Sequence, residues 1–128
     1  MPNILIIDDD KLVREATRTL LTAGGYDVVA VEDGKAGIAA AKAGQFDLAI
    51  VDLFMPGMDG LKVIEAIRQF SPNLPMIVAS GFMFGSECPQ MPEFERMANE
   101  AGALSALYKP FRPKGLLQAV EKAIGAAT

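Results

Sequence analysis

Four short apolar segments of this chain each run into polar side chains that can take part in phosphoryl or metal chemistry. In chain order these endings are Asp8-Asp9, Asp52, Ser80 and Lys109. Carboxylates bind hard cations and can act as nucleophiles, a hydroxyl can hydrogen-bond an oxyanion, and an amine supplies compact positive charge. Each ending alone has a commoner structural role, such as a turn, a helix cap or a surface lysine. Their recurrence at successive segment ends favours one shared site.

The apolar segments themselves predict strands. They cover residues 3–7, 46–51, 74–79 and 104–108, and a further strand is predicted over 26–31. Short apolar runs that alternate with helical patterns are typical of an α/β fold whose parallel sheet is covered on both faces. Ligands of such sheets bind beyond the carboxyl ends of the strands, where the strand order reverses. We therefore expect the three acids, the hydroxyl and the amine to share one edge of the sheet.

Helical spacing fills the intervals between these strands. The predicted helices cover 11–23, 35–43, a segment from Asp59-Gly60 to Phe70, a segment carrying Phe94, Met97, Ala98 and Ala101, and a last helix from Pro113. Asp10 and Asp33 are predicted N-caps, and Gly24 and Gly44 are predicted helix ends. In the first helix the apolar spacing is carried by Leu12, Val13, Ala16 and Leu20. Residues 53–58 and 81–92 are predicted loops, so the whole chain, 1–128, is interpreted as one (βα)5 domain.

Composition excludes several other classes of protein. A chain of 128 residues suits one domain, and it has no apolar stretch of the roughly 20 residues needed to span a bilayer. A net charge of −4 opposes binding of a nucleic-acid backbone by this chain. The absence of histidine excludes a histidine-based triad and an imidazole zinc site. A single cysteine and the lack of a signal peptide indicate a cytoplasmic protein.

The three acids predict a bound cation. Asp8, Asp9 and Asp52 at one edge would crowd negative charge, which is costly unless a cation lies among them. Magnesium fits this set, because it prefers one or two carboxylates, several waters and a phosphate oxygen. Lys109 would add positive charge from the opposite side of the same site.

Over nearly its whole length the chain resembles a response-regulator receiver domain of two-component signalling, of the single-domain kind found in chemotaxis. The matching segments are Ile6-Ile7-Asp8-Asp9-Asp10, residues 51–60 with their Asp-x-x-Met-Pro-x-Met-Asp-Gly pattern, Ala79-Ser80, and Lys109-Pro110-Phe111. The resemblance implies a flavodoxin-like (βα)5 fold with five parallel strands in the order 2-1-3-4-5.

The resemblance also implies a role for each site residue. Asp52 would accept a phosphoryl group from a phosphohistidine on a sensor histidine kinase or a histidine phosphotransfer protein. Asp9, Asp52 and the backbone carbonyl of Phe54 would hold Mg²⁺, with Asp8 acting through a metal-bound water. Lys109 and Ser80 would bind phosphoryl oxygens, and movement of Ser80 would change a surface read by a downstream protein. Such a domain relays a signal and is not an enzyme with a turnover of its own.

Three features depart from the family pattern. Ala106 stands where an aromatic residue is common, and residues 81–92 lengthen the segment between Ser80 and Lys109. Phe54 and Phe82 stand where polar residues often position a hydrolytic water, so we expect a long-lived phosphorylated form.

Three other interpretations stay open. The first is a pseudo-receiver, an interaction module of the same fold that is not phosphorylated. The second is a haloacid-dehalogenase-like phosphatase that uses Asp8 and Asp10 with Ser80 and Lys109. It lacks an acidic pair after the lysine, since the next acid is Glu121, and it leaves Asp52 without a role. The third is a receiver excised from a longer regulator, although the helical end of the chain favours a stand-alone protein.

Overall fold

The protein is described here by a computed structural model. The structure describes residues 2–55, 58–81, 96, 99–100, 102–103, 105–109 and 113–127. Within these ranges only the backbone is described for residues 54, 55, 58, 59, 80, 81, 105–109, 126 and 127.

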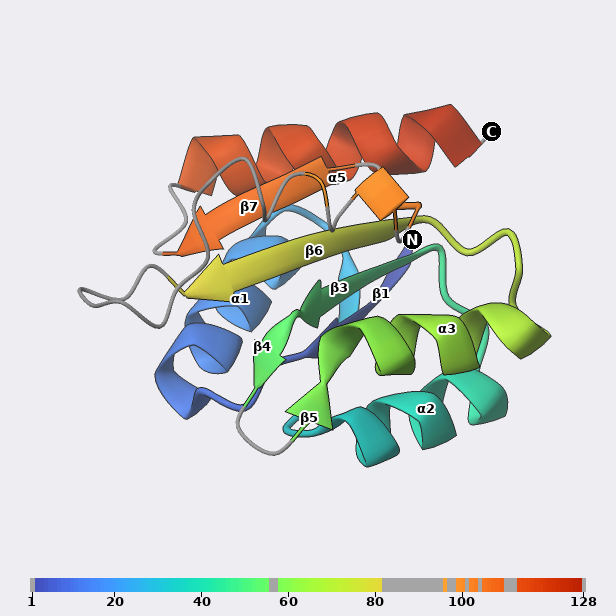
Figure 1. The fold of residues 1–128 in the computed structure, drawn as a ribbon. Coiled ribbons are helices and arrows are strands. Elements are labelled where there is room, and N and C mark those ends of the chain that lie inside the picture. Colours follow the sequence, from blue (N-terminus) through green and yellow to red (C-terminus); the bar gives the residue numbers. More distant parts are fainter. Residues whose placement is uncertain are drawn as a thin grey trace.

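A parallel five-stranded sheet forms the centre of the fold (Figure 1). Its strands are β1 (Asn3–Ile7), β2 (Asp27–Val31), β3 (Leu48–Asp52), β6 (Met76–Gly81) and β7 (Ser105–Lys109). They lie in the order β2-β1-β3-β6-β7, and the chain reverses its direction across the sheet between β1 and β3. The described helices are α1 (Lys11–Ala23), α2 (Gly34–Ala43), α3 (Gly60–Phe70) and α5 (Pro113–Ala127). The expected flavodoxin-like arrangement of a parallel sheet and helices is confirmed.

Two hydrophobic layers hold the helices to the sheet, which explains why the strand sequences are continuously apolar. In β1, Leu5 and Ile7 face one layer, whereas Ile4 and Ile6 face the other. The first layer also contains Val63, Ile64 and Ile67 of α3 and Ala41 of α2. The second contains Leu21 of α1 and Leu116, Val120 and Ala123 of α5. Because successive strand residues point to opposite faces, a sheet covered on both sides needs apolar residues at every position.

The predicted helix boundaries are largely confirmed by their caps. Oδ1 of Asp10 accepts hydrogen bonds from the amides of Leu12 and Val13, and Oδ1 of Asp33 accepts one from Ala36. Helices α1 and α2 end at the predicted Gly24 and Gly44. Helix α2 begins one residue earlier than predicted, at Gly34, and β2 begins one residue later, at Asp27.

Only part of the apolar spacing predicted for α1 meets the core, where Leu20 packs against the second layer. Leu12 is 83% exposed, and the buried residues of this helix are Thr17 and Leu21. Thr17 can lie in the interior because its hydroxyl donates a 2.7 Å hydrogen bond to the carbonyl of Val13, which satisfies its polar group. The face that meets the sheet is therefore rotated away from Leu12.

The connection between β3 and α3 also differs from the prediction. Residues 53–58 were expected to form a loop, but they include β4 (Phe54–Met55), which pairs antiparallel with β5 (Met58–Asp59). Of the helix expected around residues 94–101, the structure describes Arg96, Asn99 and Glu100, all helical. The other residues of that helix, and the long segment 82–92 with Phe82, lie outside the described residues. Among the described helices, none is both long and apolar enough to cross a membrane.

Candidate functional site

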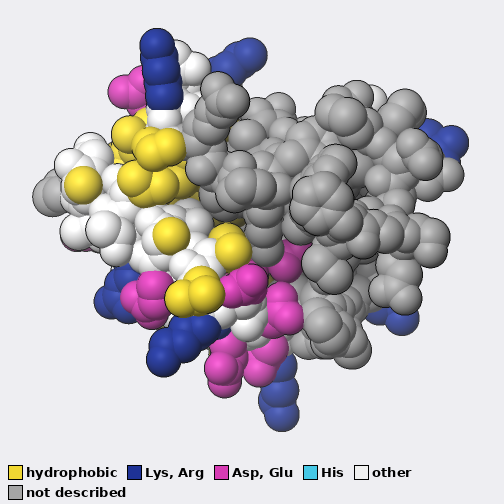
Figure 2. Space-filling model, turned by 90° about the vertical axis from the view of Figure 1, so that its left-hand side faces the viewer, with side chains coloured by type: hydrophobic (Ala, Val, Ile, Leu, Met, Phe, Trp, Pro, Cys, Tyr) yellow, Lys and Arg dark blue, Asp and Glu magenta, His cyan; other side chains and the backbone are white. Residues whose placement is uncertain are grey.

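The strand order brings the first acidic pair beside Asp52. Strands β1 and β3 are neighbours, with Ile7 opposite Val51, so the residues that follow Ile7 and Val51 leave the sheet at the same edge. One carboxylate oxygen from each of Asp8, Asp9 and Asp52 lies within 4.8 Å of the others. Asp8 and Asp52 are 5% and 4% exposed, whereas Asp9 is exposed. Figure 2, which looks onto the carboxyl ends of the strands, shows acidic side chains gathered on this face.

Asp8 is held by hydrogen bonds from three directions. Its amide donates to the carbonyl of Val31 at 3.1 Å, which extends the β1–β2 ladder by one residue. Its Oδ1 accepts a 2.9 Å hydrogen bond from the amide of Asp10, and its backbone carbonyl accepts one of 3.0 Å from Nη1 of Arg14. The carboxylate is therefore fixed in orientation before any ligand binds.

Asp52 is fixed by the strand that carries it. It is the last residue of β3 and lies opposite Ala79 of β6, and the next amide, that of Leu53, donates a 2.9 Å hydrogen bond to the carbonyl of Ala79. The ladder thus continues past Asp52 and holds its backbone on both sides. A buried carboxylate whose backbone is held in place can present one oxygen to a reaction partner in a constant geometry.

The backbone places Ser80 and Lys109 at the same edge. Ser80 follows Ala79, the residue opposite Asp52, and Lys109 is the last residue of β7, opposite Gly81. Phe54 lies two residues after Asp52 and pairs with Asp59 in the β4–β5 hairpin. The side chains of Ser80, Lys109 and Phe54 lie outside the described residues, so the contacts expected of them stay predictions.

The three carboxylates form a donor set for a hard divalent cation. All their ligand atoms are oxygens, and Mg²⁺ prefers oxygen ligands. Two of the carboxylates are buried, and buried like charges repel one another strongly unless a cation neutralises them. The residues that are present therefore fit a magnesium ion.

Sequence reasoning missed one residue that contacts this site. Arg14 reaches back six positions to the carbonyl of Asp8. The available signal was an arginine on the second turn of a helix that starts directly after an acidic pair. A basic residue at such a place is more often a solvated surface group, and spacing alone does not distinguish the two.

Comparison with known proteins gives a consistent result. Residues 4–121 match the family described as the response regulator receiver domain. The chain is 32% identical over 119 residues to response regulator protein FleR of Pseudomonas aeruginosa, covering 93% of this chain and 24% of FleR. It is 35% identical over 115 residues to response regulator MprA of Mycolicibacterium vanbaalenii, covering 89% of this chain and 46% of MprA.

Solved structures resemble it as well. Chemotaxis protein CheY4 of Vibrio cholerae superposes with a TM-score of 0.85 at 29% identity, covering 96% of this chain and 98% of CheY4. The chain spans about a quarter of FleR and about half of MprA.

Proposed function

We propose that this chain, which belongs to the response regulator receiver domain family, accepts a phosphoryl group on the carboxylate of Asp52. The donor is a phosphohistidine of a sensor histidine kinase or of a histidine phosphotransfer protein. One observation supports this role above the others. Asp52 is 4% exposed at the end of a central strand, and the carboxylates of Asp8 and Asp9 lie beside it within 4.8 Å.

The proposed step is a transfer from nitrogen to oxygen. A carboxylate oxygen of Asp52 bonds to phosphorus while the bond from phosphorus to the donor imidazole nitrogen breaks, and that nitrogen takes up a proton. The product is an acyl phosphate on Asp52. Asp9, Asp52 and the carbonyl of Phe54 would hold Mg²⁺, with Asp8 acting through water, and the ion supplies charge neutralisation for the transferring oxygens.

Ser80 and Lys109 are proposed to bind the phosphoryl oxygens. Support comes from their positions at the ends of β6 and β7, on the edge of the sheet that also carries Asp52. The Lys109 amine would supply positive charge beside the phosphoryl oxygens. A hydrogen bond from the Ser80 hydroxyl would draw the following backbone inward and alter a surface that a downstream protein binds. We place this relay in the cytoplasm.

Family membership makes this a signalling domain and not a classical enzyme. A haloacid-dehalogenase-like phosphatase would use Asp10 as its acid. However, Oδ1 of Asp10 already caps α1 through two amides, those of Leu12 and Val13, and this contact argues against that use.

Phosphorylation by a small donor tests the proposal. Wild type, Asp52→Asn and the matched control Asp33→Asn are incubated with acetyl phosphate, with and without Mg²⁺, and their intact masses are measured. Asp33 caps α2 and is not one of the three clustered carboxylates, and asparagine is an equally good cap. We expect a phosphoryl adduct on wild type and on Asp33→Asn only when Mg²⁺ is present, and none on Asp52→Asn. An unmodified wild type would support the pseudo-receiver instead.

A further inference from the structure

We propose that Arg14 is a positioning residue for the cation site, acting through the backbone of Asp8. This inference rests on the proposed function, because it concerns the ion used by the same reaction. Its basis is the 3.0 Å hydrogen bond from Nη1 of Arg14 to the carbonyl oxygen of Asp8. Arg14 is half-buried on α1, one helical turn after the N-cap residue Asp10.

The carbonyl of Asp8 lies at a buried turn, where it requires a hydrogen-bond donor. Strand β1 ends at Ile7, and α1 begins at Lys11, so the chain turns away from the sheet directly after Asp8. The residue is 5% exposed, and a buried carbonyl without a hydrogen-bond donor would destabilise the turn that carries it. A guanidinium makes a charge-assisted hydrogen bond there, which is stronger than a neutral one.

Fixing this carbonyl also fixes Asp9. The carbonyl of Asp8 and the amide of Asp9 belong to one planar peptide unit, so the orientation of the first sets the path into the second. The amide of Asp8 donates to the carbonyl of Val31, and the amide of Asp10 donates to Oδ1 of Asp8, so the peptide units before and after this one are held as well. With Arg14 in place, the turn that presents both carboxylates is held at three points.

The direction in which Mg²⁺ affinity changes on removal of Arg14 distinguishes a positioning role from a purely electrostatic one. A cation near three carboxylates repels Mg²⁺, so removing a residue that acts only through its charge would strengthen magnesium binding. Removing a residue that orients the ligands would weaken it. Loss of a group that orients metal ligands typically costs about 10–100-fold in metal affinity.

The experiment measures Mg²⁺ affinity by isothermal titration calorimetry for wild type, Arg14→Met, Arg14→Lys and the control Arg18→Met. Arg18 lies one turn further along α1, is exposed, and its side chain makes no hydrogen bond or ion pair with the described residues. The control therefore removes the same charge from the same helix. We expect Arg14→Met to bind Mg²⁺ about tenfold more weakly. Arg18→Met should match wild type, and Arg14→Lys should lie between, because an ammonium keeps the charge but not the fork of donors.

Two further measurements separate positioning from general damage. Thermal unfolding without metal reports the fold of each variant, and if Arg14→Met does not fold, Arg14→Lys is compared with Arg18→Lys. The acetyl phosphate reaction of Arg14→Met should recover its wild-type rate at saturating Mg²⁺. If wild type binds Mg²⁺ and Arg14→Met binds it equally well or more tightly, this inference is wrong and the proposed function still stands. Failure of wild type to bind Mg²⁺ overturns both.

Discussion

The amide of Gly60 donates a 3.2 Å hydrogen bond to the carbonyl of Leu53, and this contact brings the start of α3 against the residue that follows Asp52. A Cβ at position 60 would lie 2.5 Å from Cα of Leu53 and 2.7 Å from the carbonyl oxygen of Asp52. Both of these neighbours are backbone atoms, which cannot move aside as a flexible side chain can. Gly60 therefore allows the backbone next to the proposed phosphoacceptor to take its path.

Replacing this glycine should damage both fold and site. We expect Gly60→Ala to lower the free energy of unfolding by about 1–3 kcal/mol, the usual cost of forcing a group into packed space. Gly115→Ala is the matched control, because a Cβ there meets nothing within 4 Å. Alanine in a helix is favoured over glycine by about 0.5–1 kcal/mol, so the control should be as stable as wild type or more so. Urea denaturation measures both, and equal stability of the two variants would contradict the packing argument.

The acidic cluster predicts that stability depends on magnesium. Asp9→Asn removes one of the three neighbouring carboxylates and hence part of their repulsion. We expect its Tm in metal-free buffer to exceed that of wild type by about 3 °C. Added Mg²⁺ should raise the Tm of wild type, since a ligand at a hundredfold excess over Kd stabilises by about 2.7 kcal/mol. The increase for Asp9→Asn should be smaller. Calorimetry that gives both proteins the same magnesium-dependent increase would exclude Asp9 as a ligand.

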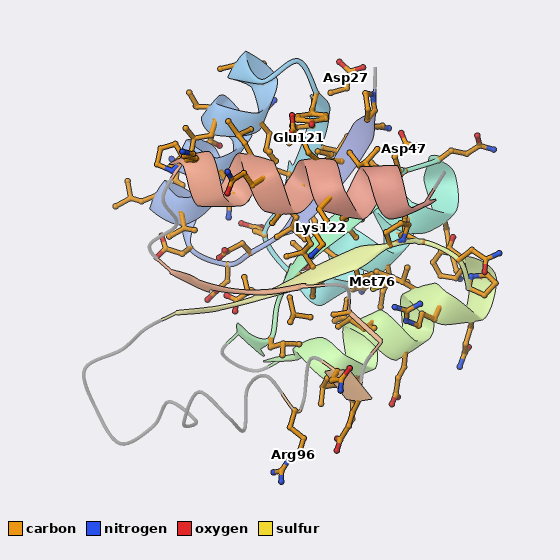
Figure 3. All side chains as sticks on the ribbon, turned by 90° about the horizontal axis from the view of Figure 1, so that it is seen from above. Asp27, Asp47, Met76, Arg96, Glu121 and Lys122 are labelled. Atoms are coloured by element: carbon orange, nitrogen blue, oxygen red, sulfur yellow. The ribbon has the colours of Figure 1, made fainter. Side chains whose placement is uncertain are left out.

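The free energy of unfolding should depend on pH in the alkaline range because of Tyr26. Burial raises the pKa of its phenol above 10.0, and the negative charge of Glu121 raises the pKa further. Figure 3 shows Glu121 on α5, on the same side of that helix as Asp27, the residue next to Tyr26. Because the folded-state pKa is the higher one, this group contributes its full stability below pH 10 and loses it as the pH rises through the folded value.

The variant Tyr26→Phe removes this titration. Its free energy of unfolding should fall less steeply than that of wild type above pH 10, while the two curves run parallel below it. Tyr108 remains in both proteins, so its ionisation cancels in the comparison. Parallel curves at all pH values would show that Tyr26 ionises equally in the folded and unfolded chain.

The neighbouring positions of Asp8 and Asp52 could be predicted from sequence. Parallel strands end at a common edge, so an apolar run that stops at an acid predicts where that acid lies. The caps at Asp10 and Asp33 were predictable for a similar reason, because the cap residue and the amides that it binds are separated by only two or three positions.

Other features depend on contacts that sequence patterns do not reveal. The β4–β5 hairpin has strands of two residues, which are too short for any periodicity. Helical spacing in α1 shows that an apolar face exists, but the angle at which the helix meets the sheet decides that Thr17 is buried and Leu12 is not. The hydrogen bond from Arg14 goes to the backbone carbonyl of Asp8, a group that every residue has, so the residue type at position 8 does not predict it. The contacts expected of the Ser80 and Lys109 side chains remain predictions.

The most direct test of the central claim is the position of the phosphoryl group. Protein treated with acetyl phosphate and Mg²⁺ is reduced with borohydride, which converts an aspartyl phosphate into homoserine, and the peptides are sequenced by tandem mass spectrometry. We predict homoserine at position 52 and aspartate at positions 8 and 9. Homoserine at position 8 with unmodified Asp52, or at no position, would contradict the assignment of Asp52 as the phosphoacceptor.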